Sequence, residues 1–253
     1  MRHAGVRAPR GTSMWGIIPA AGMGTRIQPL AFSKELLPVG CYLDGGSERP
    51  RAVSEYLVER MVCGGVDKIC FVISPGKADI LNYFGGNALS ATIFYAVQPR
   101  PAGLCDAIFR AAPMIGDAEE VCIGLPDTVW FPENALKRLP DGMLSFLLFP
   151  VEHPERFDAV LTNEHDEVLE VRVKSEQTST NWIWGALKMP GSVLHALREL
   201  WVERLDEYLG TLINEYLSRG GRAYGFKVGE AYVDVGTLNG YREALHLLDG
   251  NHR

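Results

Sequence analysis

The stretch Trp15-Gly16-Ile17-Ile18-Pro19-Ala20-Ala21-Gly22-Met23-Gly24-Thr25-Arg26 indicates both the fold and the kind of ligand. An apolar run typical of a buried strand ends in a turn of small residues and glycine, and Lys34 follows shortly after. Because glycine has no Cβ and tolerates positive φ, the backbone N–H groups of such a turn can approach an anion closely. Arginine and lysine add positive charge, and the planar fork of arginine suits phosphate. We therefore expect a nucleoside triphosphate site at the end of a first strand.

This turn differs from the two common phosphate-binding motifs. No third glycine opens a helix, as in the dinucleotide fingerprint, and no Gly-Lys-Ser/Thr follows, as in a Walker A loop. Taken alone, a glycine-rich turn between core elements explains the pattern as well as an anion site does. The basic residues that follow favour the anion site.

Composition limits the class of protein. The 253 residues, 47% hydrophobic and 22% charged, suffice for a substantial globular core. A net charge of -6 argues against non-specific nucleic-acid binding, and no run of about 18 apolar residues predicts a membrane span. The five cysteines are odd in number, lack Cys-x-x-Cys spacing and lie mostly in apolar surroundings, so we expect free thiols and a cytoplasmic location. Residues 1–13 contain no apolar segment and are expected to be a flexible tail, with Met14 an alternative start.

Hydrophobic periodicity predicts alternating strands and helices in the first half, which favours a mainly parallel sheet. The expected strands cover 15–19, 67–73, 91–97 and 120–125, and the expected helices 53–63, 77–84 and 105–112. The second half is richer in strands, at 143–150, 158–162, 168–173 and 182–189. Helices over 192–201 and 207–218, a hairpin-like pair at 222–228 and 231–235, and a helix over 238–248 complete the chain. With no repeat or linker, we predict one α/β domain with a Rossmann-like, mainly parallel mixed sheet flanked by helices.

Four motifs occur in the order found in one enzyme family. They are Pro19–Arg26 with Lys34–Val39, Gln98–Leu104, Leu125–Thr128 and Tyr232–Thr237. In this order the chain resembles the sugar-1-phosphate nucleotidyltransferases, such as glucose-1-phosphate thymidylyltransferase and UTP–glucose-1-phosphate uridylyltransferase. The resemblance covers nearly everything from Trp15 onward. It implies a GT-A-like nucleotidyltransferase fold, in which 14–130 binds the nucleotide and the β-rich 131–253 binds the sugar phosphate.

The reaction that the resemblance implies is Mg²⁺-dependent transfer from a nucleoside triphosphate to a sugar 1-phosphate, with release of pyrophosphate. Two anions must meet, so the site needs cations and hydrogen-bond donors more than a nucleophilic side chain. The resemblance assigns Arg26 and Lys34 to the phosphates as catalytic residues. It assigns the backbone of the turn to the triphosphate, through Ala20, Ala21, Gly22, Gly24 and Thr25.

Two aspartates are the candidate metal ligands. Asp127 follows a buried apolar strand, at the sheet edge where open parallel sheets bind ligands, and Asp234 follows a strand far along the chain. Carboxylate oxygens together with substrate phosphates are what Mg²⁺ prefers. Alternatively, Asp127 starts a turn and Asp234 belongs to a helix N-terminal cap.

Gln98 and Gly103 are the candidate base contacts. A glutamine amide can both donate and accept at a base edge, and in the family a glutamine here reads uracil or thymine, which favours UTP or dTTP. The Gly103 backbone can lie close to the same base. A solvated residue at a strand end is the alternative interpretation of Gln98.

The acceptor side departs from the family. Lys174 aligns with a lysine that contacts the sugar phosphate, but Val173 stands where the family usually has Glu. Trp184 and Gly185 align with the segment that lies beside the sugar in the family. Trp182 and Trp184 should share one strand face, where packing in the core is at least as good an explanation as stacking on a sugar.

The spacing from Arg26 to Lys34 is also shorter than in the family, and Thr128 follows Asp127. Together these departures leave the identity of the acceptor open. A non-sugar phosphate such as phosphocholine, and a catalytically silent nucleotide-binding subunit, are the rival interpretations. The expected partners are the two substrates, with no nucleic acid and no membrane, and a homo-oligomer is left open.

Overall fold

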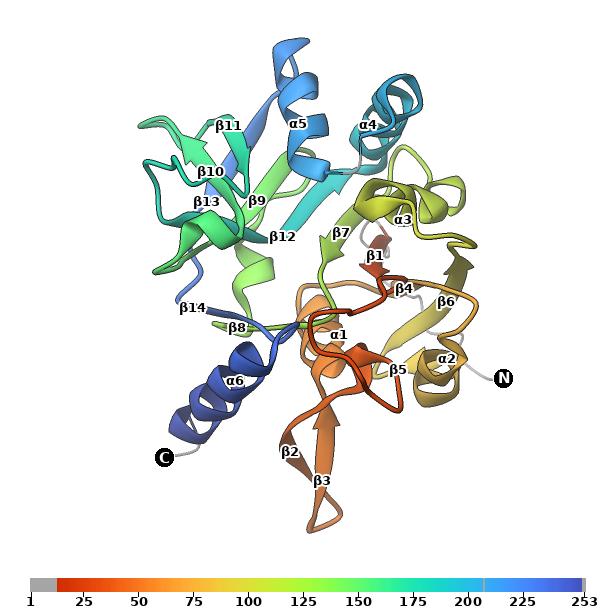
Figure 1. Cartoon of the computed structure of the whole chain (residues 1–253). Coiled ribbons are helices and arrows are strands. Elements are labelled where there is room, and N and C mark those ends of the chain that lie inside the picture. The colour runs from red at the N-terminus through yellow and green to blue at the C-terminus, as the bar shows by residue number, and fades with distance from the viewer. Residues whose placement is uncertain (1–12, 207, 252–253) are drawn as a thin grey trace, which may run out of the picture.

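Four parallel strands form the centre of the fold (Figure 1). The computed structural model describes residues 13–206 and 208–251. The central strands lie in the order β7-β1-β4-β6. Their bounds are β1 Met14–Pro19, β4 Lys68–Ile73, β6 Ala91–Val97 and β7 Glu120–Gly124. Ile17 and Ile18 are both fully buried and belong to different core clusters, because successive side chains of a strand point to opposite faces. Strands that are covered on both faces have continuous apolar sequences, so the central strands could be predicted from the sequence.

Antiparallel strands extend this sheet beyond β7. β12 pairs antiparallel with β7, β9 and β10, β10 pairs antiparallel with β11, and β13 lies parallel to β9. Short β5 (Asn87–Ala88) closes the other edge against β6. The other bounds are β9 Leu144–Pro150, β10 Asp158–Thr162, β11 Val168–Val173, β12 Trp182–Pro190 and β13 Ala223–Phe226.

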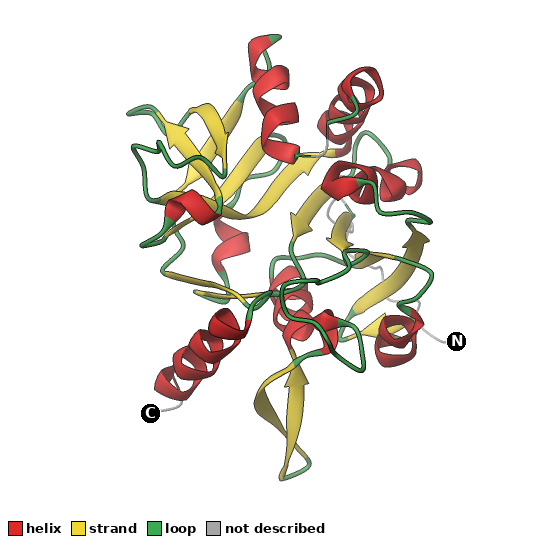
Figure 2. Cartoon of the chain, viewed as in Figure 1, coloured by secondary structure: helices red, strands yellow, loops and turns green. Residues whose placement is uncertain are grey.

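Helices cover both faces of the sheet (Figure 2). On one face pack α3 (Gly103–Ala111), α4 (Gly191–Arg204) and α5 (Leu209–Ser218). On the other pack α1 (Val53–Cys63) and α2 (Ala78–Phe84). Single 3₁₀ turns lie at Lys34–Leu36, Ala112–Met114, Ala135–Arg138 and Pro154–Arg156.

Two small sheets tie the end of the chain to its beginning. β8 (Thr128–Phe131) pairs antiparallel with β14 (Ala231–Asp234), and β2 (Pro38–Asp44) forms a hairpin with β3 (Ser47–Ala52). The last helix, α6 (Leu238–Asn251), packs on this region. A third core cluster joins these elements through Val39, Tyr56, Val129, Val235 and Leu248.

The predicted hairpin of 222–228 with 231–235 is wrong. β13 instead lies parallel to β9, and β14 pairs with β8 in a different sheet. Between them Gly229 donates to the Leu148 carbonyl, and Glu230 donates to the Phe131 carbonyl. A Cβ on Gly229 would stand 2.2 Å from Phe149 Cδ1, so the backbone presses against β9 and continues across to β8 instead of turning back. The hairpin β2–β3 was not predicted, because the polar run at 44–51 with Pro50 is typical of a loop. The short strand β8 was not predicted either.

The predicted α/β fold with a Rossmann-like mixed sheet flanked by helices is confirmed. The sheet is less parallel than expected: β7, β1, β4 and β6 pair in parallel, as do β13 and β9, and the other pairings are antiparallel. The expected tail covers residues 1–12, which lie outside the described residues, and Ser13, whose Oγ donates to Asp67 at 3.0 Å. All five cysteines are free thiols, three of them buried. Among the described residues, no helix has the length and apolar character needed to span a membrane.

Candidate active site

The loop after β1 presents a series of uncommitted backbone amides. The Ala20 N–H makes the last sheet bond, to the Val72 carbonyl at 2.8 Å. Beyond it, no N–H from Ala21 to Arg26 donates to a backbone carbonyl within residues 13–206 and 208–251. Gly24 has a φ of +64°, the left-handed conformation that glycine adopts freely. Successive N–H groups in such a turn form an anion-binding concavity. The predicted contact of the Ala20 amide with the triphosphate is wrong, because this amide is already hydrogen-bonded to Val72 in the sheet.

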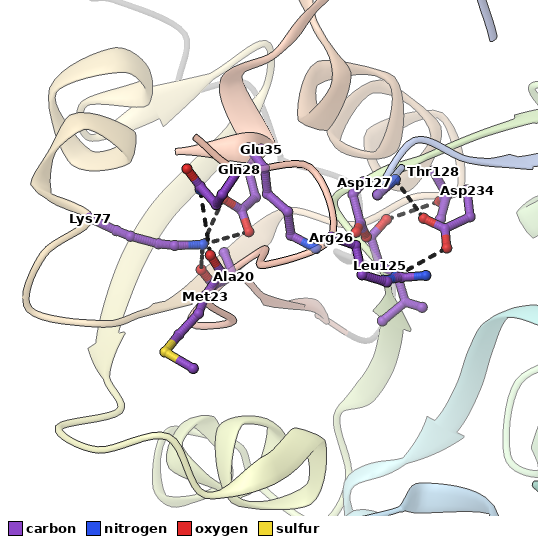
Figure 3. A network of polar contacts seen from close by, with 12 residues as sticks. Ala20, Met23, Arg26, Gln28, Glu35, Lys77, Leu125, Asp127, Thr128 and Asp234 are labelled. Atoms are coloured by element: carbon purple, nitrogen blue, oxygen red, sulfur yellow. Dashed lines mark hydrogen bonds and ion pairs between the residues drawn. The ribbon is translucent and has the colours of Figure 1, made fainter. Parts of the chain in front are cut away.

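A buried ion pair anchors the start of this loop (Figure 3). Lys77 Nζ donates to the Ala20 carbonyl and to both oxygens of Glu35, each at 2.7 Å. Glu35 is only 1% exposed. Burial raises the pKa of its carboxyl, and Lys77 opposes that rise. No sequence pattern predicted this pair: Lys77 begins the helix expected over 77–84, and Glu35 lies 42 residues earlier in the motif Lys34–Val39.

Lys34 links the loop to the first candidate metal ligand. Its side chain passes over Gly24, where a Cβ would stand 2.9 Å from Lys34 Cδ. Its Nζ then donates to Asp127 Oδ2 at 2.5 Å. Burial lowers the pKa of Lys34, but Asp127, Glu35 and Asp234 outweigh that effect and the net pKa is raised. The Lys34 ammonium is therefore a positive charge that Asp127 fixes in place near the loop, whose amides make no backbone hydrogen bonds.

Asp127 and Asp234 come together although they lie far apart in sequence. Asp127 joins β7 to β8, Asp234 ends β14, and Val235 donates to the Asp127 carbonyl at 2.8 Å. Arg26 Nη2 donates to Asp234 Oδ2 at 3.3 Å (Figure 3). Asp234 Oδ1 accepts from the Gly236 N–H at 2.7 Å, so a local contact just before α6, where a helix cap was the alternative, coexists with the long-range contacts.

Gly236 measures how tightly this group is packed. A Cβ there would stand 2.7 Å from Asp234 Oδ1, 2.9 Å from Arg26 Nη2 and 3.3 Å from Asp127 Oδ2. Burial raises the pKa of Asp234, and the like charge of Asp127 raises it further. A buried carboxylate, Asp127, and a partly buried one, Asp234, that repel each other are a suitable donor set for a divalent cation. No group of three or more His, Cys, Asp or Glu side chains that could hold a metal occurs in the described part of the chain.

Gln98 is buried and oriented by a partner that the sequence did not reveal. Its Nε2 donates to the Gly103 carbonyl at 3.1 Å and to Asp106 Oδ2 at 2.8 Å. Asp106 is paired in turn with Arg110 at 2.9 Å. Because a carboxylate only accepts, Asp106 fixes the amide nitrogen on its own side and leaves Gln98 Oε1 as the available acceptor. The alternative of a solvated strand-end residue is wrong, since Gln98 is 4% exposed.

A cavity of about 610 Å³ joins the two halves of the chain. Gly103, Leu104 and Leu125 line it from the first half, and Asp127 and Asp234 lie in its wall. The rest of its lining is Arg26, Thr128, Arg156, Phe157, Asp158, Lys174, Trp184, Tyr208, Leu209 and Tyr232. The volume is typical of small-molecule sites.

Comparisons with known proteins identify the family of this chain. Residues 15–249 match the family model described as "Nucleotidyl transferase", which covers most of the chain. The chain belongs to the nucleotidyl transferase family. A glucose-1-phosphate thymidylyltransferase of Neisseria meningitidis is 27% identical over 247 residues, 93% of this chain and 82% of the relative. One of Mycobacterium tuberculosis is 28% identical over the same shares.

Solved structures of similar proteins share the fold of this nucleotidyltransferase. A putative glucose-1-phosphate thymidylyltransferase from Bacillus anthracis superposes with a TM-score of 0.79 at 21% identity, covering 93% of this chain and 95% of that one. A UDP-glucose pyrophosphorylase from Acinetobacter baumannii gives 0.77 at 21% identity, covering 95% and 94%. The predictions of the family, of an enzyme and of the nucleotidyltransferase class are confirmed.

Within this nucleotidyltransferase, Arg26, Gly103, Asp127, Lys174, Trp184 and Asp234 line the cavity described above. Lys34 reaches it through its ion pair with Asp127, and its side chain lies against Gly24 of the loop. Gln98 does not line the cavity but is bonded to Gly103, which does. Gly185 instead packs into the core, where a Cβ would stand 2.5 Å from Phe149 Cε2, and Trp182 is half-buried against the core that holds Trp184.

Sequence reasoning missed Lys77, Asp106, Arg156, Asp158 and Tyr208. None of these lies in a quoted motif, and only the fold places them here.

Proposed function

We propose that this nucleotidyltransferase transfers a nucleotidyl group from UTP or dTTP to a sugar 1-phosphate, with Mg²⁺, and releases pyrophosphate. The observation that carries the proposal is the meeting of Asp127 and Asp234 in one cavity beside the free loop amides. The names of the relatives, thymidylyltransferases and a UDP-glucose pyrophosphorylase, support the reaction class.

The chemistry requires no nucleophilic side chain. An oxygen of the acceptor phosphate attacks the α-phosphorus of the triphosphate and forms the new P–O bond. The bond from the α-phosphorus to the bridging oxygen breaks, and the electron pair leaves with pyrophosphate. Catalysis then consists of positioning and of stabilising charge.

The residues on the nucleotide side suit these tasks. The amides from Ala21 to Thr25 would hold the triphosphate, and Lys34 and Arg26 would balance the charge that develops on the leaving pyrophosphate. Asp127 and Asp234 would hold Mg²⁺, which when bound offsets charge on the phosphates. No third His, Cys, Asp or Glu of the described residues joins these two carboxylates in a metal-binding group, so substrate phosphates would complete the coordination of Mg²⁺.

The orientation of Gln98 supports a uracil or thymine base. The imide N3–H of either base donates, and Gln98 Oε1 is the acceptor that Asp106 leaves available. Cytosine has no hydrogen on N3, so the same oxygen would face another acceptor. An unpaired polar contact of this kind discriminates strongly between substrates. The proposed preference is therefore UTP or dTTP over CTP.

Pyrophosphate release tests the proposal directly. Purified protein with Mg²⁺ is incubated with each nucleoside triphosphate and a panel of sugar 1-phosphates. Release is expected with UTP or dTTP, and Asp127→Asn and Asp234→Asn should each lower kcat by about 100-fold or more. Asp166→Asn, the same change at the exposed turn between β10 and β11, is the matched control and should retain activity. Absence of pyrophosphate release with every pair of substrates would refute the proposal.

A further inference from the structure

Asp158 is a carboxylate of the cavity wall, and one of its two oxygens lacks a hydrogen-bond partner among the described residues. It is the first residue of β10 and lines the cavity together with Lys174 and Trp184. Its Oδ1 is buried yet has no hydrogen-bond partner in the part of the chain that the structure describes. Burial raises the pKa of its carboxyl, and Lys174 and the Trp184 indole oppose that rise. Buried polar atoms in folded proteins are nearly always paired, so an orphan oxygen in a cavity wall points to a ligand.

The sheet explains why this carboxylate stands at position 158. Asp158 lies directly opposite Val173 in the antiparallel pair of β10 and β11, and such cross-strand neighbours share a face. Val173 is packed under α5, where a Cβ on Gly210 would stand 2.7 Å from Val173 Cγ2. Val173 is not among the residues that line the cavity. Its cross-strand neighbour Asp158, at the start of β10, is.

The surrounding side chains favour a neutral, hydroxylated ligand. The rings of Phe157, Trp184, Tyr208 and Tyr232 line the same cavity and offer flat apolar surface to the C–H faces of a sugar.

The charges of the cavity point the same way. Asp127 and Asp234 are paired with Lys34 and Arg26. Of the other charged residues in the lining, Arg156 and Lys174 are cations and Asp158 is the anion. A cationic acceptor would therefore enter a positively charged region, which disfavours the phosphocholine alternative.

We infer that Asp158 selects the acceptor by accepting hydrogen bonds from hydroxyl groups of its sugar ring. This role rests on the proposed function and adds a specificity residue on the acceptor side. Lys174, which lies in the same wall with its Nζ 5.6 Å from the Tyr208 ring centre, remains available to the acceptor phosphate.

Kinetics with Asp158→Ala and Asp158→Asn test the inference. The probes are glucose 1-phosphate, or the sugar 1-phosphate that the wild type uses best, and its analogues that each lack one hydroxyl. Asp158→Ala should raise KM for the sugar 1-phosphate by about 10- to 100-fold, as expected for a lost hydrogen bond to a charged group, and leave KM for the nucleotide unchanged. Asp158→Asn should recover part of this loss, because its amide oxygen still accepts.

The analogues identify the hydroxyl groups involved. Wild type should discriminate against at least one deoxy analogue by about 10- to 100-fold, and Asp158→Ala should lose that discrimination. Asp166→Asn on the same hairpin serves as the matched control and should keep the wild-type pattern. Thermal unfolding confirms that each variant is folded, and Asp158→Asn carries the test if Asp158→Ala is not.

The outcomes separate the two proposals. If the wild type uses sugar 1-phosphates and both variants keep its KM and its discrimination, the role of Asp158 is refuted and the proposed function stands. If Asp158→Asn is as impaired as Asp158→Ala and the wild type prefers an aminoalkyl phosphate, the negative charge recognises a cation and the hydroxyl assignment is wrong. If the wild type releases no pyrophosphate with any sugar 1-phosphate, the proposed function itself fails.

Discussion

Replacing Lys77 with methionine should leave the Glu35 carboxylate buried without its cation. The two side chains are 12% and 1% exposed, so water cannot take the place of the lost ammonium. Lys34 is the other cation that acts on Glu35, and it is already held by Asp127. In the variant, Glu35 is expected to fold in its neutral form.

The cost of this neutralisation can be worked out from the ordinary glutamate pKa of 4.5. Each pH unit between that value and the solution pH costs about 1.4 kcal/mol, so folding with a neutral Glu35 costs about 3.4 kcal/mol at pH 7. Because burial already raises the Glu35 pKa in the wild type, this value is the upper bound of the stability lost on replacing Lys77. At pH 5 the same reasoning leaves only about 0.7 kcal/mol. The sign follows because a raised pKa in the folded state makes the native protein bind more protons, and stability then falls as the pH rises above 4.5.

Thermal unfolding at pH 7 and pH 5 measures this effect. For a chain of this size, a loss of at most about 3.4 kcal/mol corresponds to a Tm lower by at most about 7 to 14 °C at pH 7. The deficit should shrink to a few degrees at pH 5, and the double variant Lys77→Met with Glu35→Gln should recover most of the loss at pH 7 because no charge remains buried. Lys137→Met, which removes an exposed lysine, is the control. A deficit that is the same at both pH values, or that the double variant does not relieve, would show that packing and not charge explains the role of Lys77.

Three further predictions concern the site itself. Gly236→Ala should lower kcat by about 100-fold with little change in Tm, because the new Cβ would stand 2.7 Å from Asp234 Oδ1 and push that carboxylate aside. Gly86→Ala, where nothing lies near the new Cβ, is the control and should change neither kcat nor Tm. Asp106→Ala should free the Gln98 amide to turn, and the ratio of kcat/KM for UTP or dTTP to that for CTP should fall by about 10-fold or more. Chelation by EDTA should abolish pyrophosphate release and Mg²⁺ should restore it; turnover that persists in EDTA would contradict the metal role of the two aspartates.

Much of the fold was predictable because it follows from local patterns. The helix expected over 53–63 has those bounds in the structure, since apolar spacing and the Gly64-Gly65 stop are local signals. The central strands were equally clear, as continuous apolar runs bounded by turns. The predicted hairpin near the C terminus failed, because its two strands pair with partners far away in sequence.

Fold class, family motifs and the chemical types available to the site follow from the order of the amino acids, because periodicity and glycine turns act through neighbouring residues. Which of these groups meet depends on the folded arrangement of the whole chain. Arg26 and Asp234 are 208 residues apart and Lys34 and Asp127 are 93 apart, yet both pairs are in contact. Asp158 lies in no motif, yet the pairing of β10 with β11 and β12 brings it into the cavity wall. Such contacts depend on strand order and register, which are set by burial across the whole domain and not by any short stretch of chain.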